Sequence, residues 1–154
     1  PELPDIRLYL DLLRPRLIGA TLRRAAVRGV SLLRTFDPPI ESAEGHRVES
    51  VTRIGKRVVL SFDHGAHFVF HLMIAGRFRW ADAGAGNVAD AKASKVDQAT
   101  FALDRGTLTL TEAGNKKRAS LHIVQGDDAL ARFNPGGLDL FACRSEERRV
   151  GKEC

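Results

Sequence analysis

Residues 47–72 read RVESVTRIGKRVVLSFDHGAHFVFHL, and the pattern in this stretch indicates the fold class. It contains three short segments rich in β-branched and aromatic residues, Arg47–Ile54, Arg57–Phe62 and His67–Leu72. Such residues favour extended strands because their side chains fit a pleated, half-buried surface. The sequence Asp63-His64-Gly65, between the last two segments, is typical of a turn. The stretch therefore predicts three consecutive β-strands.

Further segments of the chain have the same composition and are separated by turn residues such as Asp37-Pro38-Pro39 and Arg105-Gly106. They are Leu22–Val30, Arg77–Trp80, Thr100–Leu103, Thr107–Leu110 and Ala119–Val124. Short strands at this spacing are typical of antiparallel sheets. We therefore expect a mainly β fold with an N-terminal helix, in which about eight strands form an antiparallel two-sheet β-sandwich flanked by helices. A barrel is the alternative, and Gly84–Ala93 is expected to be a loop.

Residues 5–17 are predicted to form the N-terminal helix, with Asp5 as its N-cap. Apolar residues recur there at helical spacing: Ile6, Tyr9, Leu10, Leu13 and Leu17. We expect Pro15 to kink or shorten the last turn and Gly19 to end the helix. A short second helix is predicted over Asp128–Phe133.

Composition places limits on function. The 154 residues, 44% hydrophobic and 28% charged, are typical of one globular domain. No apolar run approaches the ~18–20 residues of a membrane helix and no signal peptide is visible, so we expect a cytoplasmic protein without a membrane partner. The formal charge of +5 permits an anionic partner but supports nucleic acid only weakly. The two cysteines, Cys143 and Cys154, cannot complete a four-ligand zinc site, so we expect no metal and no cofactor in this chain.

The first five residues, Pro1-Glu2-Leu3-Pro4-Asp5, carry candidate chemistry. With an initiator methionine removed, Pro1 has a free secondary amine whose pKa is about 7.7–8.0, so that part of it is neutral at pH 7. A neutral amine attacks an aldehyde-like carbon to form a cationic iminium, which is an electron sink. Glu2 could act as general acid or base at the same centre. The alternative is that Pro1 and Pro4 only stiffen the start of the chain and Glu2 is solvated.

This pentapeptide resembles the start of the formamidopyrimidine-DNA glycosylase and endonuclease VIII family, and three further stretches resemble family blocks in the same order. Ile54-Gly55-Lys56-Arg57 resembles a hairpin with a DNA-contacting lysine. The block from Phe70 to Gly76, followed by Arg77-Phe78-Arg79, resembles the family's His-Leu-Gly-Met-Ser-Gly block, and Pro135-Gly136-Gly137-Leu138 resembles the segment that closes its N-terminal domain. The resemblance covers essentially residues 1–141.

The resemblance implies a bifunctional DNA glycosylase and abasic-site lyase of base excision repair, acting as a monomer on damaged double-stranded DNA and associated with a bacterial nucleoid when bound. Pro1 would attack C1′ of the damaged nucleotide, Glu2 would transfer protons at the sugar ring oxygen, and β/δ-elimination would follow. Lys56 and His71 would contact phosphate. Their alternative interpretations are a solvated residue before a strand and an ordinary strand residue.

Two departures from the family pattern bear on DNA recognition. Ile74 stands where the family has a wedge methionine, and Met73 stands where it has a glycine; either could insert between bases, or both could be core residues. Thr111–Ala119 replaces the family's Asp-Pro-Arg-Arg-Phe-Gly and offers Lys116-Lys117-Arg118 without an aromatic residue. We expect this triplet at the DNA face, with a solvated turn as the alternative, and the preferred lesion and opposite base are not determined.

We assign residues 1–143 to a catalytic N-terminal domain. Residues 144–154, RSEERRVGKEC, are expected to be a solvated tail or an artefact, because they resemble the translation of a sequencing adapter. The family's helix–two-turn–helix and zinc-ribbon modules are not in residues 1–154, so structural zinc is expected only beyond them, and the fragment should be a weak or inactive enzyme. The alternative function is a non-catalytic DNA-binding relative that kept the fold and lost lesion recognition.

Overall fold

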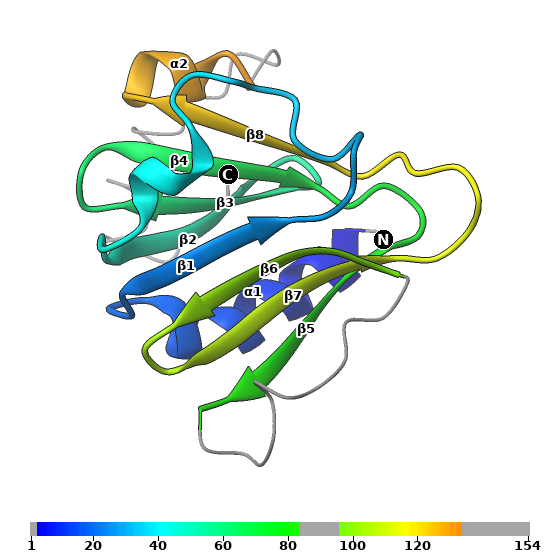
Figure 1. Ribbon diagram of the computed structural model, residues 1–154, viewed down its shortest axis with the longest axis horizontal. Helices are drawn as coiled ribbons and strands as arrows, with labels where there is room; N and C mark the ends of the chain where they lie inside the picture. Colours follow the sequence, from blue (N-terminus) through cyan, green and yellow to red (C-terminus); the bar gives the residue numbers. More distant parts are fainter. Residues whose placement is uncertain (1–2, 84–95, 134–154) are drawn as a thin grey trace.

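Eight strands form two antiparallel sheets in the computed structural model, which describes residues 3–83 and 96–133 (Figure 1). One sheet has the strand order β1-β6-β7-β5 and the other β2-β3-β4-β8. The strands are β1 (Leu22–Val27), β2 (Val48–Ile54), β3 (Arg57–Phe62), β4 (Ala66–His71), β5 (Gly76–Asp82), β6 (Asp97–Leu103), β7 (Gly106–Glu112) and β8 (Ser120–Gln125). The predicted two-sheet sandwich is confirmed, and the barrel alternative is excluded.

Aromatic side chains hold the two sheets together. Phe68 and Phe70 project from β4 toward Phe101 of β6, with ring centroids 5.9 and 5.6 Å apart respectively. Phe78 of β5 meets the Phe70 ring edge-on at 5.2 Å. Phe68, Phe70 and Phe101 are fully buried or nearly so. Burial of each such side chain stabilises the fold by about 1.5–3 kcal/mol, so these rings are the main attachment between the sheets.

The β2-β3-β4-β8 sheet is covered on both faces. Val59 and Val69 alternate with the inter-sheet residues and pack instead with Leu130 of helix α2 (Asp127–Ala131). This second layer explains why β3 and β4 are buried along almost their whole length, since neither face of the sheet meets water there. Helix α2 begins one residue before the predicted segment and ends two residues before its end.

Helix α1 (Leu3–Leu17) places its apolar stripe against the core. The predicted stripe is confirmed, because Ile6, Leu10, Leu13 and Leu17 are at most 4% exposed. The prediction that Pro15 shortens the last turn is wrong. Proline removes only one helical hydrogen bond, and it does so near the helix end. The helix stays against β2 because residues on both sides of Pro15 are buried and because Arg14 Nε donates a 2.9 Å hydrogen bond to the Val51 carbonyl. Gly19, with φ +87°, follows the helix end as expected.

Other differences lie at the boundaries of the elements. Strand β1 ends at Val27 rather than Val30, because the amides of Arg28 and Gly29 both donate to the Gln98 carbonyl. A short 3-10 helix, η1 (Ile40–Ala43), was not predicted. The predicted loop Gly84–Ala93 lies outside the described residues. Within the described ranges, no helix is long and apolar enough to cross a membrane.

The chain segment at residues 32–35 pairs with the outer side of β8. The amide of Leu121 donates to the Leu32 carbonyl at 2.8 Å, and the amide of Arg34 donates to the Leu121 carbonyl at 2.9 Å. The hydroxyl of Thr35 accepts a hydrogen bond from the Ile123 amide at 3.0 Å. The outer backbone groups of Leu121 and Ile123 are therefore satisfied by a segment that is not a regular strand.

Candidate functional site

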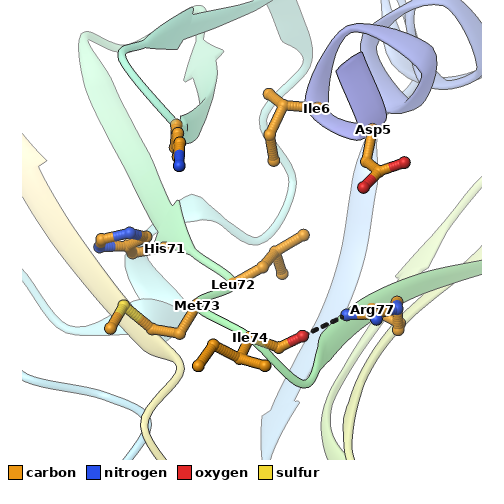
Figure 2. Close-up of a pocket in the computed structure, with 8 residues that line it drawn as sticks. Asp5, Ile6, His71, Leu72, Met73, Ile74 and Arg77 are labelled. Atoms are coloured by element: carbon orange, nitrogen blue, oxygen red, sulfur yellow. Dashed lines mark hydrogen bonds between the residues drawn. The ribbon is translucent and has the colours of Figure 1, made fainter. Parts of the chain in front are cut away.

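An open pocket of about 380 Å³ lies where the start of α1 meets two turns of the sandwich (Figure 2). Its lining comes from α1, from the β2–β3 turn, from the end of β4, from the β4–β5 turn and from the start of β5. The lining residues are Asp5, Ile6, Lys56, His71, Leu72, Met73, Ile74 and Arg77. Four of the residues selected from the sequence, Lys56, His71, Met73 and Ile74, therefore meet in one place.

Hairpin geometry places Lys56 beside His71. Gly55 adopts φ +60°, which favours glycine, and allows β2 to turn directly into β3 so that Ile54 pairs with Arg57. In the next pair of strands Arg57 is the register partner of His71. Lys56 precedes Arg57 directly, so register alone places its exposed side chain at the same end of the sheet as the His71 imidazole.

His71 is half-buried in a positively charged environment. Burial lowers its pKa below the usual 6.5, and the charges of Arg57 and Lys56 lower it further. The imidazole is therefore neutral at pH 7 in the unbound protein. An anion bound beside Lys56 would reduce the positive field and so raise the pKa of His71.

The β4–β5 turn presents one apolar side chain to solvent. Met73 has φ +58°, an unfavourable left-handed conformation for a residue with a Cβ. Ile74 follows it and is 77% exposed. Arg77 Nη1 donates to the carbonyls of Ile74 and Gly76, at 2.8 Å each. Position 76 requires glycine, because a Cβ there would collide with the backbone of Leu72. The turn is therefore fixed in a shape that projects Ile74 outward, as Figure 2 shows.

The basic triplet Lys116-Lys117-Arg118 does not line this pocket. It lies in the loop between β7 and β8, which Figure 1 shows at the same end of the sandwich as the β4–β5 turn and the start of α1. Glu112, only 2% exposed, organises the loop: its Oε2 accepts the amides of Arg118 and Ala119 at 2.9 Å each. Lys117 Nζ donates to the Glu112 carbonyl at 2.6 Å. The triplet is thus part of a loop held by hydrogen bonds, in which Lys116 and Arg118 are exposed to solvent.

Pro1 and Glu2 lie outside the described residues, and their proposed roles stay predictions. Four lining residues were not selected from the sequence as site residues: Asp5, Ile6, Leu72 and Arg77. Asp5 was assigned only as the N-cap of the helix, and this is wrong because α1 begins at Leu3 and Asp5 lies within its first turn. Ile6 was assigned only to the core. Arg77 and Arg79 were named only as residues that follow a family block, and Arg79 Nη2 lies 3.5 Å from the buried carboxylate of Asp97.

The family model for the formamidopyrimidine-DNA glycosylase N-terminal domain matches residues 1–119. The chain belongs to this family. The formamidopyrimidine-DNA glycosylase of Solibacter usitatus is 30% identical over 115 residues, which are 73% of this chain and 40% of that protein. That of Beijerinckia indica is 31% identical over 155 residues, covering 99% of this chain and 49% of that protein. The chain thus spans less than half the length of these two formamidopyrimidine-DNA glycosylases.

A solved structure of a formamidopyrimidine-DNA glycosylase shares the fold. The Lactococcus lactis protein in complex with DNA containing an abasic site gives a TM-score of 0.74 at 19% identity, over 97% of this chain and 57% of that one. The family pattern also explains the positive φ of Met73. The family block resembled by residues 71–76 has a glycine at this position, and φ +58° is a conformation that glycine adopts readily.

Proposed function

We propose that this chain is the catalytic N-terminal domain of a bifunctional DNA glycosylase and abasic-site lyase of base excision repair. The observation that carries the proposal is the pocket at the start of α1, which gathers Lys56, His71 and the exposed Ile74. Chain connectivity keeps Pro1 within about 14 Å of Asp5, which lines that pocket. A nucleophile at Pro1 would therefore be close to cationic groups suited to the DNA backbone and to an apolar side chain suited to the base stack.

The proposed chemistry starts from the neutral amine of Pro1. Its nitrogen forms a bond to C1′ as the bond from C1′ to the damaged base breaks, and the base leaves with a proton. The sugar ring then opens: the nitrogen lone pair forms a C=N iminium while the ring oxygen accepts a proton, which Glu2 is positioned in the sequence to supply. The iminium acidifies the proton on C2′, and loss of this proton expels the 3′ phosphate. Loss of a second proton, from C4′ of the resulting unsaturated iminium, expels the 5′ phosphate. The iminium itself is the electron sink, so these steps use no cofactor.

The described residues have separate roles in this proposal. Lys56 binds the phosphate beside the lesion, and His71 adds a charged donor once that phosphate is present. Ile74 fills the gap left by the displaced nucleotide, because it is the exposed apolar side chain at the tip of a fixed turn. Met73, half-buried and in a left-handed conformation, shapes the turn. The proposed partner is damaged double-stranded DNA, and the Lactococcus lactis structure supports this because it holds DNA that contains an abasic site.

Borohydride trapping on a duplex with one abasic site tests the mechanism, at low salt because phosphate contacts weaken as salt rises. We expect a covalent adduct with the free Pro1 amine and none with Pro1→Gly or a form that retains the initiator methionine. Lys56→Gln should reduce trapping strongly, whereas the matched control Arg23→Gln, an exposed charge on β1, should not. A trapped adduct that peptide mass spectrometry places on a residue other than Pro1 would contradict the assignment of the nucleophile.

A second function, a non-catalytic DNA-binding relative, is favoured by one observation. The β7–β8 loop is ordered by Glu112 and carries three basic residues without an aromatic one, so that it suits phosphate contacts and not the stacking of a base. Fluorescence anisotropy with the same duplex separates the two functions. Binding without any trapped adduct, at equal affinity for damaged and undamaged DNA, would support the second.

A further inference from the structure

Two histidines and an aspartate meet at the end of the sandwich opposite the pocket. Asp63 and His64 form the β3–β4 turn, and His46 precedes β2. Strands β3 and β4 run from this turn to Lys56 and His71, so the cluster lies about 20 Å from the pocket. It therefore has no part in the proposed DNA chemistry.

The donor atoms of this cluster are at distances that suit a shared ion. The Nδ1 of His46 is 2.8 Å from Asp63 Oδ1, the Nδ1 of His64 is 3.9 Å from the same oxygen, and one donor atom from each of the three residues lies within 4.8 Å of the others. Ligands of a tetrahedral zinc ion at ordinary bond lengths are about 3.3 Å apart. Adjustments of roughly 1 Å, through rotation of the exposed Asp63 and half-buried His64 side chains, bring the three donors onto one ion.

His64 provides an independent indication of a ligand. Both of its ring nitrogens are shielded from solvent, and neither has a hydrogen-bond partner among the described residues. Buried polar atoms normally have a hydrogen-bond partner, so two shielded nitrogens without one indicate that a ligand binds there. Its ring stacks on that of His46 at 3.8 Å, which is an unfavourable arrangement for two charged imidazoles.

The backbone holds the three side chains in place from both sides. The Asp63 amide donates to the Arg47 carbonyl at 2.9 Å, which ties the turn to the residue after His46. The His46 carbonyl accepts from the Leu22 amide at 2.9 Å, and the His64 carbonyl accepts from Gln125 Nε2 at 2.8 Å. Because both segments are fixed, little conformational freedom remains to be lost when an ion binds.

We propose that His46, Asp63 and His64 form a binding site for a divalent transition-metal ion of the zinc type. Two imidazoles and one carboxylate are the donor set that such ions prefer, and the exposed side of the cluster leaves a fourth position to water. The bound ion would link His46, in the segment before β2, to Asp63 and His64 in the β3–β4 turn.

The test uses the 154-residue chain with Cys143 and Cys154 changed to serine, so that thiols do not bind the probe. Zn²⁺ is titrated by calorimetry into the metal-free protein, with ¹⁵N-labelled histidine followed by NMR. We expect one equivalent to bind and to shift the ring nitrogens of His46 and His64 alone. His64→Gln and Asp63→Asn should weaken binding by about 100-fold, while His122→Gln, a half-buried histidine on β8, should leave it unchanged.

Each other outcome would overturn the proposal. These are no saturable binding of Zn²⁺, a shift confined to other histidines, or equal affinity in the parent and in His64→Gln. Thermal unfolding of each metal-free variant shows whether it is folded. Asp63→Asn keeps the test decisive if His64→Gln unfolds, because the Asp63 side chain is exposed on a turn and its amide replacement retains an acceptor for His46.

Discussion

Replacement of Glu112 by alanine should be among the most destabilising single changes in the described part of the chain. One oxygen of this buried carboxylate accepts two backbone amides, those of Arg118 and Ala119. A hydrogen bond to a charged group contributes about 1.5–3 kcal/mol, and an amide left buried without a partner costs about 1–3 kcal/mol. Because both bonds share one acceptor they are not additive, so we expect Glu112→Ala to lower the free energy of unfolding by about 3–5 kcal/mol.

Glutamine at position 112 separates the hydrogen bonds from the charge. Its amide oxygen still accepts both donors, so the loss should be about 1–2 kcal/mol. Urea unfolding followed by the fluorescence of Trp80, the single tryptophan, measures both values. The exposed Glu49 on β2 is the matched control, and Glu49→Ala should stay within about 0.5 kcal/mol of the parent. A loss below about 1 kcal/mol for Glu112→Ala, with an unchanged urea dependence, would refute the anchoring role.

Three further outcomes are expected. At position 73, glycine should be more stable than alanine by about 1 kcal/mol, because both lack the methionine side chain and only alanine keeps a Cβ at φ +58°; thermal unfolding of Met73→Gly and Met73→Ala compares them. Burial lowers the pKa values of His71 and His122 below 6.5, so these histidines take up protons in the unfolded state at a higher pH than in the folded state, and the free energy of unfolding should fall as pH drops below 6.5. Urea unfolding at several pH values measures this fall, which should be smaller in the double variant with glutamine at positions 71 and 122. Phe70→Ala should cost about 3–5 kcal/mol in urea, and Phe36→Ala, at a side chain 96% exposed, almost nothing; equal losses would contradict the assigned core.

The strands were predictable where hydrophobic patterns coincide with burial. The segment Arg57–Phe62 was predicted with its observed bounds, because burial of both sheet faces is matched by a run of apolar residues at Val58, Val59 and Leu60. Strand β6 was predicted to begin at Thr100 but begins at Asp97. Its first residues, Asp97 and Gln98, are polar and buried, and the Gln98 carbonyl is held by amides from the distant β1 end. A buried polar residue whose hydrogen-bond partner is distant in the sequence leaves no pattern in the neighbouring residues from which its strand could be predicted.

The pocket residues and the cluster of His46, Asp63 and His64 are also brought together by contacts between residues that are distant in the sequence. Lys56, His71 and the residues after His71 were selected through family blocks, and hairpin register explains why they meet. The sequence spacing of His46 and His64 is not that of a local ligand motif. They meet because the pairing of β2 with β3 closes the intervening loop, and that register is known only from the folded sheet.

The pairing of residues 32–35 with β8 also bears on how this chain behaves at high concentration. A strand at the margin of a sheet offers unpaired amides and carbonyls on which a second molecule can add a strand, and this is a common route to aggregation. Here Leu32 and Arg34 already occupy such groups on the outer side of β8. A proline at residue 34 would remove the Arg34 amide and expose the Leu121 carbonyl. The protection of this margin from self-association therefore depends on a few hydrogen bonds of an irregular segment.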